Sequence, residues 1–93
     1  LTTIFAPGGN SLRYLTDISF DLSGRADVTV RVYNSAGKLE RVIVRDEPMA
    51  PGRISLKWNG QDEDQRSVSS GLYIVVVNAG DARREKTVAV VKQ

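Results

Sequence analysis

The stretch WNGQDEDQRSVSSGLYIVVV, residues 58–77, decides how the rest of the chain is interpreted. A polar, acidic segment lies here between the single tryptophan and the apolar run LYIVVV. Such a run, rich in β-branched residues and preceded by Ser and Gly, is typical of a buried central strand. The acidic segment before it is therefore an active site, a metal-binding loop or a polar connection between two strands. Each of these alternatives implies a different function.

Strand-like patterns continue on both sides of this stretch. Apolar residues alternate with polar ones at 18–22, 28–33 and 54–58, and a short first strand is expected at 2–5. The turn sequence NSAG at 34–37 predicts a hairpin in which Gly37 takes a positive φ. Residues 39–45 are apolar on both faces, which predicts a bulge or a two-sided environment. Pro48, Pro51 and Gly52 predict a crossing loop without regular pairing.

The last strand is expected at about residues 83–91. Within it, residues 87–91 are largely apolar on both faces, whereas an exposed edge strand normally carries more charge on its outer face. We therefore expect residues 87–91 to pair within the sandwich, beside the strand at 72–77. About seven strands separated by turns predict an all-β fold, an immunoglobulin or fibronectin type III-like antiparallel sandwich, with a closed barrel as the lesser alternative. A chain of 93 residues suits a single domain over 1–93.

Composition excludes much chemistry. The chain has neither Cys nor His, which removes thiolate nucleophiles, Ser-His pairs and imidazole or thiolate metal ligands. A net charge of +2 does not by itself imply a nucleic-acid partner. The longest apolar run is far shorter than the roughly 20 residues that span a bilayer, so no membrane insertion is expected. These observations predict a non-enzymatic domain with no cofactor.

The acidic segment has three interpretations. A catalytic pair of Asp62 and Asp64 would need a substrate groove, which a short loop at the end of a sandwich does not offer. Asn59, Asp62 and Asp64 are the candidate calcium ligands, but they supply about three oxygens where Ca²⁺ takes 6–8. In the favoured interpretation, Asn59 and Gly60 form a tight turn and the acids accept hydrogen bonds from local backbone amides. The segment is then a polar connection without a ligand.

Two further groups of residues have competing interpretations. Trp58 could stack on a sugar, but it continues the inward series Ile54, Leu56, Trp58, which favours a core role. Tyr73 is expected to pack and to bond a backbone group. A group of basic residues that can align as a stripe on one sheet face is interpreted first as a solvated charged face, with a partner-binding surface as the alternative. Its residues are Arg31, Arg41, Arg45, Arg83, Arg84 and Lys86.

Three stretches carry a resemblance to a known family: ADVTVRVYNSAGKLERVIV, APGRISLKWNGQDEDQRSVSSGLYIVVV and REKTVAVVK. They resemble the immunoglobulin-like domain of the flagellar hook-capping protein family. They also resemble the related C-terminal modules of secreted bacterial proteins, including type A sorting domains of type IX secretion. This chain has Asn59 where the family usually has Asp, and Gln65 where it usually has Gly, which weakens a cation-binding role.

The resemblance implies a non-catalytic module at the C-terminus of a larger secreted or cell-surface bacterial protein. Such a module acts as a spacer, docking or sorting domain. Its expected partners are the preceding domain of the parent protein and another protein or the secretion machinery. The alternatives are a flagellar hook-cap assembly domain and an accessory carbohydrate-binding module of a secreted hydrolase.

Overall fold

The computed structural model describes residues 2–6 and 16–92, and every regular element in this part of the chain is a β-strand. The seven strands are β1 (Thr2–Ala6), β2 (Thr16–Leu22), β3 (Ala26–Asn34), β4 (Leu39–Met49), β5 (Gly52–Trp58), β6 (Gly71–Ala79) and β7 (Ala82–Lys92). None of the described residues forms a helix that could span a membrane.

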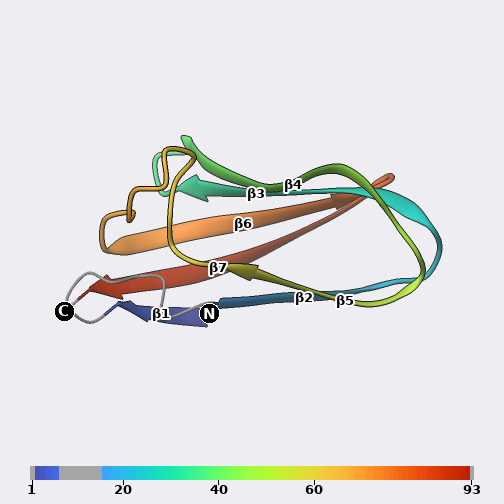
Figure 1. The fold of residues 1–93 in the computed structure, drawn as a ribbon, viewed down its shortest axis with the longest axis horizontal. Helices are drawn as coiled ribbons and strands as arrows, with labels where there is room; N and C mark the ends of the chain where they lie inside the picture. Colours follow the sequence, from blue (N-terminus) through green and yellow to red (C-terminus); the bar gives the residue numbers. More distant parts are fainter. Residues whose placement is uncertain (1, 7–15, 93) are drawn as a thin grey trace.

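The strands form two sheets that face each other. The larger sheet has the order β1-β7-β6-β3-β4, and the smaller consists of β2 and β5 (Figure 1). The all-β sandwich of seven strands is confirmed, as is the central position of β6. One pairing differs from the expected antiparallel pattern, because β1 and β7 are parallel. These strands lie far apart in the sequence, so no tight turn has to join them, and parallel pairing is open to them.

The core follows directly from the alternation in the sequence. Val28, Val30 and Val32 of β3 are fully buried, and Ile18 of β2 and Trp58 of β5 face them from the smaller sheet. The inward residues of β6 and β7, together with Val68 of the loop before β6, complete this cluster. The predicted turn at 34–37 is confirmed: Gly37 has φ +85°, and its amide donates to the Asn34 carbonyl at 3.0 Å.

Strand β4 contains the irregularity that its two apolar faces predicted. Val42 pairs with Arg31 and Val44 pairs with Val30, so Ile43 is an extra residue between two successive pairs. Ile43 and Val44 both pack against the core as a result. The predicted bulge is confirmed, and it explains why this strand is apolar on both sides.

The prediction of a loop without regular pairing was wrong for Pro48 and for Gly52, which begins β5 and pairs with Leu22. Strand β4 continues through Pro48, which pairs with Asp27, to Met49, which pairs with Ala26. Only Ala50 and Pro51 remain outside the strands at the crossing to the smaller sheet. An edge strand pairs on one side only, so it can include a proline, which lacks the backbone donor, without losing its ladder.

Candidate functional site

The acidic loop between β5 and β6 is held by hydrogen bonds within the loop. Two backbone hydrogen bonds join its two sides: the Asp62 amide donates to the Arg66 carbonyl, and the Val68 amide donates to the Gly60 carbonyl, both at 2.9 Å. At the start of the loop, the Asn59 side-chain oxygen accepts from the Gln61 amide at 3.1 Å, and Gly60 has φ +76°. The predicted Asn-Gly turn is confirmed.

The Asp62 carboxylate orders the tip of this loop. Its Oδ1 accepts hydrogen bonds from the Asp64 amide at 2.8 Å and from the Arg66 amide at 3.1 Å. Gln65, between these two residues, has φ +64°, a left-handed conformation that favours glycine. This accounts for the glycine that the resembled family usually has here. The acid serves the backbone as the polar-connection interpretation predicted.

The candidate calcium ligands are Asn59, Asp62 and Asp64. The side-chain oxygens of the first two, Asn59 and Asp62, each accept a hydrogen bond from a backbone amide of the loop itself. Over residues 2–6 and 16–92, no group of three or more His, Cys, Asp or Glu side chains is placed to hold a metal ion.

Adding excess chelator should accordingly leave the melting temperature of the domain unchanged. A metal required for folding would link its binding free energy to stability, and its removal would lower the midpoint by many degrees. Thermal unfolding followed by circular dichroism, with and without chelator and with calcium added back, checks this. A large calcium-dependent rise in the midpoint would contradict the polar-connection interpretation.

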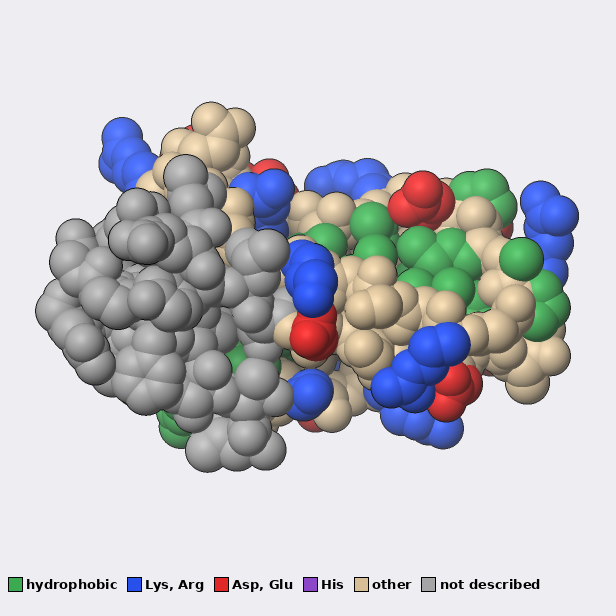
Figure 2. Space-filling model, turned by 60° about the horizontal axis from the view of Figure 1, so that its bottom comes forward, with side chains coloured by type: hydrophobic (Ala, Val, Ile, Leu, Met, Phe, Trp, Pro, Cys, Tyr) green, Lys and Arg blue, Asp and Glu red, His purple; other side chains and the backbone are tan. Residues whose placement is uncertain are grey.

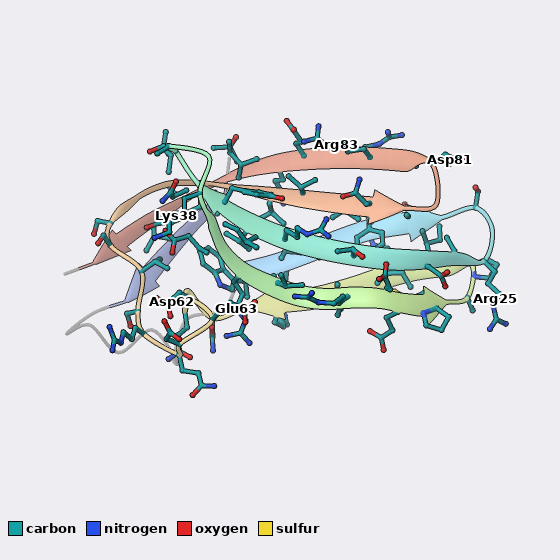
Figure 3. The ribbon with its side chains drawn as sticks, turned by 90° about the horizontal axis from the view of Figure 1, so that it is seen from above. Arg25, Lys38, Asp62, Glu63, Asp81 and Arg83 are labelled. Atoms are coloured by element: carbon teal, nitrogen blue, oxygen red, sulfur yellow. The ribbon has the colours of Figure 1, made fainter. Side chains whose placement is uncertain are left out.

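The same loop covers the free edge of β4. The Glu63 amide donates to the Glu40 carbonyl at 3.0 Å, and the Glu63 carboxylate accepts from the Val42 amide at 2.6 Å. Arg41 adds a bond from Nη1 to the Asp62 carbonyl at 3.1 Å. Asp62 and Glu63 lie at the end of the molecule that carries Lys38 and the β3–β4 turn (Figure 3). The Glu40 carbonyl and the Val42 amide are thereby occupied, so this part of the edge cannot pair with another chain.

Replacing Glu63 by alanine should remove this cover. The Val42 amide loses its acceptor, and we expect faster hydrogen exchange at Val42 with a stability loss below about 1 kcal/mol, since the bond is exposed. Glu63→Gln keeps a side-chain oxygen in reach and is the matched control. An exchange rate at Val42 in Glu63→Ala equal to that of the parent chain would show that the carboxylate does not protect the edge.

Trp58 and Tyr73 form the buried aromatic pair beneath the loop. Trp58 is 1% exposed and Tyr73 5% exposed, and their rings meet edge to face with centroids 5.6 Å apart. Trp58 Nε1 donates to the Gln61 carbonyl at 2.9 Å, and the Tyr73 hydroxyl donates to the Ser69 carbonyl at 2.6 Å. The expected core role of Trp58 and the expected backbone bond of Tyr73 are confirmed. The tyrosine bond resembles the tyrosine corner of immunoglobulin-like sandwiches.

Tyr73 gives the domain a predictable response to alkaline pH. Burial, with a smaller contribution from the negative charge of Glu40, raises the pKa of the Tyr73 hydroxyl above its usual value. Above a pH of about 10, the unfolded chain ionises Tyr73 while the folded chain keeps the proton, so stability falls as pH rises through the folded pKa. Tyr73→Phe should remove this component and cost about 1 kcal/mol at neutral pH. Denaturant unfolding at pH 7 and above pH 10 checks both, and an unchanged alkaline loss in Tyr73→Phe contradicts the assignment.

The predicted basic stripe is divided between different surfaces. Arg31 and Arg83 lie on the outer face of the larger sheet, and Arg83 pairs with Glu85 at 2.6 Å. Figure 3 shows Arg83 on β7. Arg41 is used by the acidic loop, and Arg45 is exposed on β4. Arg84 and Lys86 instead line a groove beside β2. A single stripe of all six is thus not formed, and partner binding by these residues stays a prediction.

Sequence reasoning did not single out Glu63 or Gln61. Their roles depend on β4 being an edge strand and on Trp58 lying directly beneath the loop. The abundance of acceptors in a loop next to an irregular strand is the one signal that could have suggested them.

Comparison with known proteins places this geometry among related domains. The family model for the FlgD Ig-like domain matches residues 11–83. The crystal structure of FlgD from P. aeruginosa is similar with a TM-score of 0.66 at 17% identity, over 91% of this chain and 62% of that one. Dimeric latent PorU from Porphyromonas gingivalis is similar with a TM-score of 0.55 at 20% identity, over 83% of this chain and 8% of that one. The chain thus spans less than two thirds of either protein. Comparison with curated protein sequences found no match.

Proposed function

This chain belongs to the FlgD Ig-like domain family, and we propose that it is a non-catalytic structural and interaction module of a secreted or cell-surface bacterial protein. It acts there as a spacer, docking or sorting domain for the protein that carries it.

The observation that carries this proposal is the use of the acidic loop. This loop holds the densest group of carboxylates in the sequence, and the Asp62 and Glu63 carboxylates both accept hydrogen bonds from backbone amides. The Asp62 carboxylate orders the connection between β5 and β6, and the Glu63 carboxylate covers part of the edge of β4. A carboxylate engaged in this way is a structural group, which supports a rigid module rather than an enzyme.

A role in flagellar hook-cap assembly is the second candidate, and the similarity to FlgD over 91% of this chain favours it. An accessory carbohydrate-binding role would need an exposed aromatic ring on which a sugar can stack, and Trp58 was the candidate for it. Trp58 is the single tryptophan, and its ring is buried against Tyr73 instead of lying on the surface.

Domain exchange in the parent protein tests the proposal. Residues 1–93 are replaced by an unrelated immunoglobulin-like sandwich, and the chemical activity of the remaining protein is measured in lysate beside its amount at the cell surface. We expect unchanged activity per molecule. Loss of surface protein would identify docking or sorting, and full retention would identify a spacer. Loss of chemical activity in a folded, soluble exchange protein would overturn the non-catalytic assignment.

A further inference from the structure

The sandwich is open along the side where β2 lies beside β7. Two adjoining cavities of about 360 and 500 Å³ occur here and share Phe20, Val77 and Arg84 among their lining residues. Together they form one groove along β2. Its apolar surface includes Phe20 and Leu22 of β2 and Val75 and Val77 of β6. Figure 2, which brings the β2 side of the molecule forward, shows apolar side chains gathered between charged ones at the end away from the grey residues.

Both strands that border the groove have unpaired edges within the described part of the chain. Strand β2 pairs with β5 alone, so its other edge is unpaired, and residues 18–22 of β2 line the groove. Strand β1 joins β7 only from Val88 onward, which leaves residues 82–87 of β7 paired on one side. A free strand edge beside an apolar groove is the geometry that accepts an added strand.

The charge of the groove limits which strand it can accept. The carboxylate of Asp21 is paired with Arg53 at 3.2 Å, and that of Glu85 with Arg83 at 2.6 Å. Arg84 and Lys86 make no ion pair with any described residue, and they follow the inward spacing of Val88 and Val90 on β7. Two unpaired cations two residues apart repel a basic strand, and a wholly apolar strand would have to desolvate them without offering a partner, so the edge does not pair indiscriminately. The same spacing matches two carboxylates on one face of a facing strand.

We propose that this groove binds an extended acidic segment of a partner protein, which adds to β2 as a third strand of the smaller sheet. Carboxylates two residues apart in that segment meet Arg84 and Lys86, and flanking apolar side chains cover Phe20 and Val77. Main-chain hydrogen bonds to β2 contribute affinity, and the two charges select the segment. This inference rests on the docking role proposed above and names the surface that performs it.

The probe is the peptide acetyl-TVTETETVT-amide, in which Val and Glu share one face of a strand. We expect it to bind the 93-residue chain in a calorimetric or NMR titration, and to slow amide exchange across residues 17–22 of β2. Binding should weaken with added salt, since the contacts are partly exposed. The same peptide with Lys in place of Glu tests the charge. The peptide with proline at its centre tests the ladder, because proline removes a backbone donor. Neither control should bind.

The double variant Arg84→Glu, Lys86→Glu should bind the acidic peptide about tenfold more weakly while its melting temperature stays near that of the parent chain. Lys38→Glu with Arg45→Glu is the matched control, since it changes the net charge equally at exposed positions away from the groove, and it should bind normally.

The proposal is overturned if the acidic peptide does not bind, if both double variants bind it equally, or if protection appears outside β2 and β7. A dimer of the chain that protects β2 without peptide would also overturn it, in favour of a second copy as occupant. Each of these failures leaves the domain-exchange result intact.

Discussion

Replacing Trp58 by alanine is expected to lower the free energy of unfolding by about 3–5 kcal/mol, the range for deleting a large buried aromatic side chain. Trp58 is among the largest fully buried side chains and lies in the core cluster contributed by both sheets. The variant loses the contacts of the ring, the edge-to-face pair with Tyr73 and the donor to the Gln61 carbonyl. The cavity left behind cannot collapse fully because strands on both sides hold the backbone in place.

Urea unfolding followed by circular dichroism measures this loss without relying on the fluorescence of the residue that is removed. Trp58→Phe is the matched variant, because it keeps an aromatic ring beside Tyr73 and loses only the indole donor and part of the volume. It should be less destabilising than alanine. In the parent chain, the emission of Trp58 should be blue-shifted and protected from quenchers. A quencher-accessible tryptophan with a loss below about 1 kcal/mol on substitution by alanine would contradict a core role.

The success of the sequence prediction for Trp58 and for the strands has one physical source. Strand alternation repeats every two residues, so a single pattern such as Ile54, Leu56, Trp58 fixes both the element and its inward face. Gly and Asn also favour turns by their own conformational preferences, which is why the turn at Gly37 and the turn at Asn59–Gly60 were predicted correctly. These features depend on neighbouring residues alone.

The features that the sequence did not reveal depend on sheet order. The Glu63 carboxylate has a role because β4 is an edge strand, and Pro48 is tolerated in β4 for the same reason. The six basic residues were expected on one face, but Arg84 follows the inward spacing of Val88 while Arg83 points outward. Adjacent residues of one strand lie on opposite faces, so a run such as Arg83–Arg84 cannot form one surface. Whether the inner face of such a strand is buried or exposed depends on whether the two-stranded smaller sheet reaches that part of it.

Deleting residues 86–93 is expected to unfold the domain. Val88 and Val90 lie in the core, and residues 86–90 pair with β6 from Val75 to Gly71. Strand β1 pairs with residues 88–92 of β7, so the deletion also removes the partner of β1. The two buried valines alone contribute about 1.5–3 kcal/mol each, and the lost ladders leave buried backbone groups without partners. The sum approaches the roughly 5–15 kcal/mol by which a domain is stable.

Because a deletion can unfold a domain for more than one reason, a point variant and an exchange measurement make the argument specific. Val88→Ala should lower the free energy of unfolding by about 2 kcal/mol, while Thr87→Ala, at an exposed position of the same strand, should change it by less than about 0.5 kcal/mol.

In the intact domain, amide exchange at residues 87–91 should be as slow as at 72–77, since these segments lie side by side in one sheet. Rapid exchange across residues 87–91, together with equal stability of the two alanine variants, would show that the end of the chain is a loosely held peptide. An export machinery could then read that peptide without unfolding the sandwich. Slow exchange would mean that the last strand is part of the fold, so a receptor of this strand would meet it only within the folded sandwich.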